Sequence, residues 1–132
     1  MFITFLLSLF ALYTPDEPLP MEMNGAIENI TEAFNTGDAQ KLSESFGSSI
    51  EITTPTGDGV YSKAQAKQVM QKFFSQYKAQ SNQIIHNGTS NTGSKFIVFS
   101  YKTEKEEFRI TIFLKQIGSD FQIQEIEIVK QL

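Results

Sequence analysis

The clearest pattern in the sequence is an alternation of apolar and polar residues near the end of the chain. Residues 95–103, 107–116 and 121–129 are three strand-like runs, joined by the short polar connections 104–106 and 118–120. In the middle run the apolar side chains occupy every second position, so they share one face of a pleated sheet. The pattern predicts an antiparallel sheet whose apolar face needs a cover. The residues of this face in the middle run are Phe108, Ile110, Ile112 and Leu114.

The segment best suited to cover that face is a helix predicted over residues 63–79. Its apolar residues recur at i, i+3, i+4, i+7, i+8 and i+11, which makes one continuous stripe. Ser62 and Gln65 form a capping box, in which each side chain accepts a hydrogen bond from the backbone N–H of the other residue. We assign the stripe to the core. It consists of Ala66, Val69, Met70, Phe73, Phe74 and Tyr77.

Four further elements complete the predicted domain. Helical spacing predicts helices over 22–36 and 39–46, and a period-two pattern predicts a strand over 50–54. Residues 82–92, ahead of the turn at 91–94, are expected to form the next strand. The stretch 55–59, which contains Pro and two Gly, is predicted to be a turn. We therefore expect an α+β fold in which three helices pack on a curved, mainly antiparallel sheet. The predicted order of elements is α-α-β-α-β-β-β-β.

Two features of the final strands depart from a one-sided sheet. Residues 96–101 are apolar on both faces, and Phe113 interrupts the polar face of the next strand. Continuous apolar strands are buried on both sides, so we expect a partial cover on the outer face of the sheet. The cover that we predict is a second copy of the chain, which would make the protein a homodimer. A change of phase between Phe121 and Ile126 predicts a β-bulge near residues 124–125.

The N-terminal residues differ from the rest in composition. Residues 2–13 are apolar or small without a break, and three prolines follow within 15–20. A helix of this length rises about 18 Å, too short to span a bilayer core of about 30 Å. We expect residues 1–20 to be a signal peptide with a Pro-rich spacer and residues 21–132 to be the domain. No basic residue precedes the apolar run and no Ala-x-Ala site is obvious, so a buried strand and a misplaced start codon stay open.

Composition argues against several classes of protein. A formal net charge of −4 with scattered basic residues does not suit a nucleic-acid surface, which needs clustered Lys and Arg. The chain has no cysteine and therefore no disulfide, thiolate nucleophile or lipid-modified cysteine. We expect an exported periplasmic or extracellular protein that is not a lipoprotein. Since no phosphate-binding Gly loop and no cluster of metal ligands is present, we predict neither a cofactor nor a metal site.

The order of the predicted elements resembles the nuclear transport factor 2-like superfamily, a cone-shaped α+β fold. Residues 36–42 (TGDAQKL) resemble the entry to its second helix, and residues 61–66 (YSKAQA) resemble the entry to its long helix. The resemblance covers about residues 26–129. More narrowly, the sequence resembles an exported bacterial family of unassigned function through the motifs at 62–66, 73–74, 86–88 and 108–109.

This resemblance implies a place for a site. The enzymes of the superfamily work in the cavity between the long helix and the concave face of the sheet, with buried carboxylates or a His–Asp pair and Tyr donors. In this chain none of the four regular strands clearly points an Asp inward, and all four Asp lie in linkers, caps or turns. The superfamily includes enzymes and catalytically inert modules, so the resemblance implies the fold and leaves the function open.

Three side chains are candidates for a ligand site in the cone. His86 is the only histidine, and its pKa suits a general acid or base near neutral pH. A histidine at a strand end that bonds a neighbour or water is the alternative interpretation. Tyr61 and Tyr101 could line a cavity mouth and donate their hydroxyls to a ligand. Packing at the edge of the core explains both tyrosines equally well.

Three hypotheses of function follow. The first is an exported, non-catalytic module that binds a small apolar or amphipathic molecule in the cone through Tyr61, His86 and Tyr101. The second is a protein-interaction or homodimerisation module that uses the outer face of the sheet. The third is an isomerase- or dehydratase-like enzyme that transfers a proton through His86. It requires His86 to lie in a cavity beside a carboxylate or a tyrosine.

Overall fold

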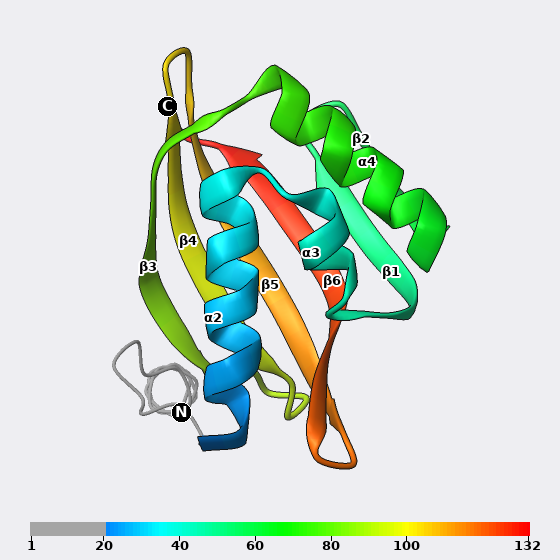
Figure 1. Ribbon diagram of the computed structural model, residues 1–132. Coiled ribbons are helices and arrows are strands. Elements are labelled where there is room, and N and C mark those ends of the chain that lie inside the picture. The colour runs from blue at the N-terminus through cyan, green and yellow to red at the C-terminus, as the bar shows by residue number, and fades with distance from the viewer. Residues whose placement is uncertain (1–20) are drawn as a thin grey trace, which may run out of the picture.

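The computed structural model describes residues 21–132, in which helices lie on one face of a curved sheet (Figure 1). The helices are α2 (Met21–Thr36), α3 (Ala39–Ser43) and α4 (Lys63–Gln76). The strands are β1 (Phe46–Thr54), β2 (Gly57–Ser62), β3 (Ala79–Thr89), β4 (Lys95–Thr103), β5 (Glu107–Ile117) and β6 (Asp120–Lys130). We call the face under the helices the inner face and the opposite one the outer face.

The sheet has six strands in the order β2-β1-β6-β5-β4-β3. β1 and β6 pair in parallel, and all other neighbours are antiparallel. The two hairpins β4–β5 and β5–β6 bring the C-terminal strands to the centre. The edges of the sheet are therefore β2 on one side and β3 on the other.

Local sequence signals set where the helices begin. Asp38 is the N-cap of α3, and its Oδ1 accepts a hydrogen bond from the backbone N–H of Lys41 at 3.0 Å. The capping box at α4 is formed, with Ser62 and Gln65 each accepting the other's backbone N–H at 3.2 Å. These bonds satisfy amide groups that have no partner within a helix, so each helix starts at the expected residue.

Aromatic rings fill the space between the helices and the inner face. Phe34 of α2 lies 5.3 Å from Phe99 and 5.4 Å from Phe74, measured between ring centroids. Phe73 of α4 lies 5.3 Å from Phe108 and 5.6 Å from Tyr101. Tyr101 itself is completely buried. The middle of the cone is therefore a packed core of aromatic rings in T-shaped and tilted contact.

The predicted fold class and order of elements are confirmed, and the differences are local. The stretch 55–59, predicted as a turn, forms a hairpin that adds β2 as a further strand. Phe46 begins β1 instead of ending the second helix, because its side chain is buried against the sheet core. The long helix ends at Gln76, since Tyr77 leaves helical geometry at φ −132°. The predicted bulge is confirmed by a shift of the β5–β6 register that skips Gln124.

The predictions for residues 1–20 lie outside the described residues. Among residues 21–132, no helix is long and apolar enough to cross a membrane.

Candidate functional site

Buried polar atoms without partners mark the line where α2 packs against β3. They belong to Thr31 (Oγ1), Asn82 (Nδ2 and Oδ1) and Asn87 (Oδ1), and none of them has a hydrogen-bond partner among residues 21–132. Asn82 is only 9% exposed, and neither end of its amide has a partner in the part of the chain that the structure describes. We call these three residues the polar seam. Polar groups at such depth are normally hydrogen-bonded, so the polar seam needs an explanation.

The geometry of α2 places Thr31 on the side of β3. α2 packs against α3 on one flank and against β3 on the other (Figure 1). Asn29 points to α3, because its Nδ2 donates to the carbonyl oxygen of Lys41 at 3.3 Å. Two residues further along a helix, a side chain is turned by about 200°, so Thr31 lies on the opposite flank.

The β3–β4 register places both asparagines on the inner face. Asn82 pairs with Tyr101, and Asn87 pairs with Ile97. Tyr101 and Ile97 both belong to the core beneath the helices, and paired residues of antiparallel strands point to the same face. The two positions lie four residues apart along β4, a span of about 13 Å. The polar seam therefore runs along the inner face of an edge strand, beside the aromatic core.

Tyr101 borders the polar seam, but its hydroxyl is hydrogen-bonded elsewhere. Its hydroxyl donates a hydrogen bond of 2.6 Å to the backbone carbonyl of Tyr77. Burial raises the pKa of Tyr101 to about 12, so the phenol stays protonated at neutral pH. β3 itself carries no Asp, Glu, Lys or Arg. The polar seam thus presents neutral amide and hydroxyl groups next to aromatic rings.

His86 lies on the outer face. It pairs with Val98, which stands three residues before Tyr101 in β4 and therefore points the other way. A bulge between Ile84 and His86 shifts the register of β3 at this point. His86 and Tyr101 are consequently on opposite faces of the sheet.

Tyr61 is at the far edge of the sheet. It lies on β2, opposite Ile50 of β1, and packs half-buried against the edge of the core. Its ring folds over Gly59, where an added Cβ would come within 2.8 Å of the Tyr61 hydroxyl. β2 and β3 are the two ends of the strand order. Tyr61, His86 and Tyr101 therefore occupy three separate environments, and the structure does not gather them into one site.

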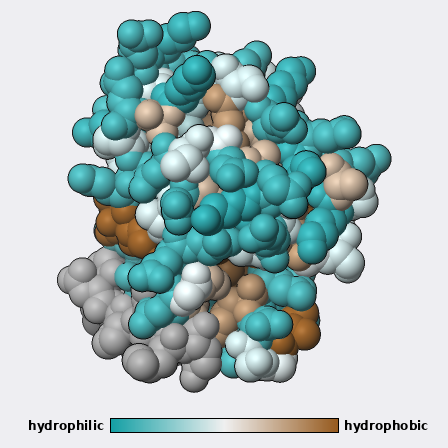
Figure 2. All heavy atoms as spheres, viewed as in Figure 1, coloured by the Kyte–Doolittle hydropathy of each residue, from teal (hydrophilic) through white to brown (hydrophobic). Residues whose placement is uncertain are grey.

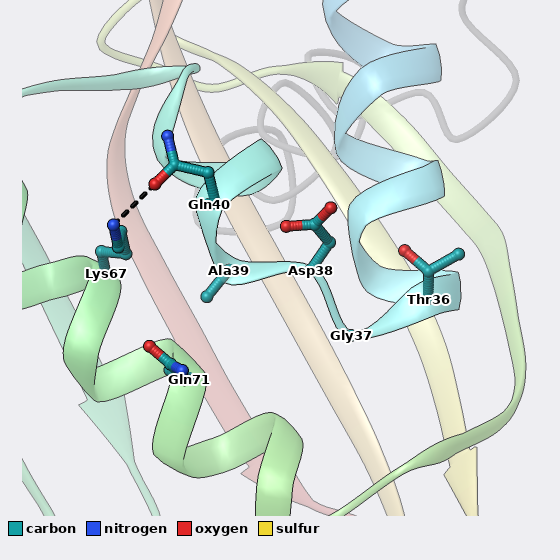
Figure 3. A pocket seen from close by; sticks show the side chains of 7 residues that line it. All are labelled: Thr36, Gly37, Asp38, Ala39, Gln40, Lys67 and Gln71. Atoms are coloured by element: carbon teal, nitrogen blue, oxygen red, sulfur yellow. Dashed lines mark hydrogen bonds between the residues drawn. The ribbon is translucent and has the colours of Figure 1, made fainter.

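A depression lies where the turn between α2 and α3 meets α4 (Figure 3). It has a volume of about 430 Å³ and opens to solvent. Lys67 donates to Gln40 Oε1 at 2.6 Å across its rim, and Asp38 caps α3. These polar groups are already engaged in the fold. The lining residues are Thr36, Gly37, Asp38, Ala39, Gln40, Lys67 and Gln71.

Carboxylates gather on the outer face of β1 and β6. Glu51 pairs with Glu125, and Glu127 lies two residues further along β6. Partial burial raises the pKa of Glu125, and the charges of Glu51 and Glu127 raise it further. Residues 21–132 contain no group of three or more acidic, His or Cys side chains that is arranged to hold a metal ion.

Sequence reasoning missed the polar seam. Only Asp was considered as an inward-facing polar residue of the strands. The amides of Asn82 and Asn87 were therefore overlooked. The available signal was the position of Asn82 at the start of a predicted strand, but only the register with Tyr101 shows that it points inward. Thr31 gave no signal, because a threonine on the flank of an amphipathic helix is usually solvated.

Comparisons with solved structures support the same architecture. A protein from Bacteroides ovatus is 25% identical over 86% of this chain and 96% of its own, with a TM-score of 0.73. A protein from Bacteroides uniformis is 26% identical over 80% of this chain and 96% of its own, with a TM-score of 0.74. Both are described as DUF4783 family proteins. An NTF2-like protein of unknown function from Cytophaga hutchinsonii matches 87% of this chain and 95% of its own at 8% identity, with a TM-score of 0.59.

The helices on one face of a curved sheet and the structural neighbours together define an α+β domain of the nuclear transport factor 2-like fold. The model of the "domain of unknown function (DUF4783)" family matches residues 27–129. The chain therefore belongs to the DUF4783 family. No curated protein matches the sequence.

Proposed function

We propose that the protein is a non-catalytic module that binds a small, neutral, amphipathic molecule at the polar seam of its cone. The observation that carries this proposal is Asn82, a side chain nine-tenths buried whose amide N–H and C=O both lack a partner within the described residues 21–132. Thr31 and Asn87 add further unpaired oxygens along the same line between α2 and β3.

The energetic argument is that such groups are costly without a partner. A buried polar group with no hydrogen bond costs about 1–3 kcal/mol. The domain as a whole is expected to be stable by only about 5–15 kcal/mol. The four atoms along the polar seam that have no partner among residues 21–132 therefore lower stability by a sizeable part of that total. A ligand that hydrogen-bonds to them regains this free energy on binding.

The chemistry of the polar seam selects the class of ligand. An asparagine amide offers one donor and one acceptor side by side, which complements another amide. No charged residue lies on β3, so a neutral group is preferred over an ion. The adjoining rings of Phe34 and Tyr101, 6.1 Å apart, suit an apolar body. The expected ligand has an amide-like head and a short apolar tail.

Thermal unfolding with N-butylacetamide as the probe tests this proposal. A molecule that binds only the folded state raises the melting temperature as its concentration increases. We expect such a rise in the wild type, no rise in the Asn82→Leu variant, and a full rise in an Asn35→Leu control, because Asn35 is exposed on α2. An equal rise in the Asn82→Leu variant, or none in the wild type, would overturn the proposal.

Self-association through the outer face is a second candidate. Phe96 and Phe113 lie on this face, with ring centroids 6.3 Å apart, and the helices of residues 21–132 lie on the opposite face. Arg109 on β5 and Glu127 on β6 also lie there, so the face carries charges of both signs. Loss of a dimer in Phe113→Ser, measured by sedimentation velocity, supports this candidate.

A third hypothesis, proton transfer through His86, gains no support from this arrangement. The hypothesis requires His86 to share a cavity with a carboxylate or a tyrosine. His86 instead lies on the face opposite to Tyr101. We therefore favour binding over catalysis.

A further inference from the structure

The depression between the α2–α3 turn and α4 is lined by two side chains of opposite charge. Asp38 belongs to the turn, and Lys67 belongs to α4 (Figure 3). No ion pair joins them within residues 21–132, because the ammonium group of Lys67 donates to Gln40 Oε1 instead. An acid and a base therefore line one hollow from two different elements without neutralising each other.

The hydrogen bonds of the fold leave part of each charged group unused. The carboxylate of Asp38 accepts the backbone N–H of Lys41 through Oδ1, and within residues 21–132 its Oδ2 has no hydrogen-bond partner. An ammonium group has three N–H donors, and Lys67 uses one of them for Gln40. One carboxylate oxygen and two ammonium protons are therefore available to a bound molecule.

The rest of the lining is small or neutral and polar. Gly37, with φ 68°, has no side chain, and Ala39 adds only a methyl group, so the backbone of the turn is left uncovered. Gln71 lies one helical turn beyond Lys67, on the same side of α4. Figure 2 shows mainly hydrophilic residues over α3 and α4.

The volume of the depression suits a small molecule. It is about 430 Å³, and small-molecule sites usually have about 300–1,000 Å³. Such sites are mostly apolar, whereas this one is lined by charged, amide and hydroxyl groups. The occupant that fits this lining is therefore small and polar throughout.

We infer that this depression binds a small zwitterion, of which a free α-amino acid is the simplest kind. The carboxylate of the zwitterion pairs with the ammonium group of Lys67, and its own ammonium group pairs with Oδ2 of Asp38. A zwitterion satisfies both charges at once, whereas a simple anion meets Asp38 and a simple cation meets Lys67 as a like charge. Because the depression opens to solvent, which weakens charge pairs, we expect a dissociation constant in the millimolar range.

This site is separate from the polar seam. The polar seam lies between α2 and β3, whereas the depression lies beyond the C-terminal end of α2, between the turn and α4. The depression offers charged groups, and the polar seam offers neutral ones. Either site can therefore fail its test without affecting the other.

An NMR titration with glycine tests the inference, because glycine carries both charges and no side chain. We expect the backbone amide signals of residues 36–40 and the side-chain amide signals of Gln71 to shift and saturate. Acetate and methylammonium each carry one of the two charges. We expect each of them to bind at least about threefold more weakly than glycine, the size of effect that one exposed charge pair gives.

Two conservative variants each remove one charge of the site. Asp38→Asn keeps the cap of α3, since asparagine is as good an N-cap as aspartate, and Lys67→Met keeps the apolar stem of the side chain. Each should raise the dissociation constant for glycine at least about threefold. Lys72→Met is the matched control, because Lys72 is exposed on α4 but does not line the depression.

Three results would overturn the inference. The first is the lack of a saturating shift with glycine at concentrations well above the millimolar range. The second is acetate that binds as tightly as glycine, together with unchanged glycine binding in Asp38→Asn, which would indicate a site for anions only. The third is an equal loss of binding in Lys72→Met and Lys67→Met, which would show that binding follows the net charge of the protein.

Discussion

Replacing Asn82 by leucine should make the unliganded protein more stable. Asn82 is nine-tenths buried, and both amide atoms lack a hydrogen-bond partner among residues 21–132. Leucine has the same number of side-chain heavy atoms in the same branched shape, so it fills the space without polar atoms. Substitutions of buried polar residues usually destabilise a protein. An increase in stability would therefore be informative.

The size of the effect follows from the cost of burying an unpaired polar group. Removing the amide should recover about 1–3 kcal/mol of unfolding free energy. In a domain of this size each kcal/mol corresponds to roughly 4 °C in melting temperature. Thr31→Val, which removes the Oγ1 hydroxyl and keeps the shape, should also stabilise the protein. Asn82→Leu tests the polar seam on β3, and Thr31→Val tests it on α2.

Denaturant unfolding followed by circular dichroism measures these free energies. Asn35→Leu serves as the control. Asn35 is exposed on α2, so this substitution should change the stability little. If Asn82→Leu is less stable than the wild type, the amide makes hydrogen bonds in solution. In that case the polar seam holds no free energy for a ligand to regain, and the argument for binding fails.

Two further predictions concern groups with defined partners. Tyr101→Phe should lower stability by about 1 kcal/mol in the same assay, because it removes the 2.6 Å bond to the Tyr77 carbonyl; no loss would show that this bond contributes nothing. Glu125→Gln should raise stability at pH 7 by less than about 1 kcal/mol, because burial and the nearby carboxylates disfavour its charge. A folded-state pKa above the ordinary value makes the ionised Glu125 destabilising at high pH, and this effect fades as the pH falls through that pKa. The gain from Glu125→Gln should fade over the same range, and a constant gain from pH 3 to pH 8 would contradict this explanation.

The elements with strong periodic patterns could be predicted from the sequence. The apolar stripe of α4 and the alternation in β5 specify the two surfaces of the core, and the capping box fixes the start of α4. β2 was missed because Gly57 and Gly59 are typical of turns, while pairing with β1 is a tertiary effect. The start of β1 at Phe46 was missed for a similar reason, since its partner Ile123 is far away in the sequence.

The candidate site was harder to predict than the fold. Tyr61, His86 and Tyr101 were chosen by their chemistry, but their positions depend on strand order and on bulges. The bulge between Ile84 and His86 shifts the register of β3, which no local pattern indicates. Asn82 becomes notable only through burial and the lack of a partner, and both are properties of the packed molecule.

The most direct test of the account is an NMR titration of the protein with N-butylacetamide, following the side-chain amide signals of its asparagines. If the probe binds at the polar seam, the signals of Asn82 and Asn87 should shift and saturate, while those of the exposed Asn35 and Asn91 stay in place. If the Asn82 and Asn87 signals do not move, or if all asparagine signals shift together without saturation, the polar seam is not a ligand site.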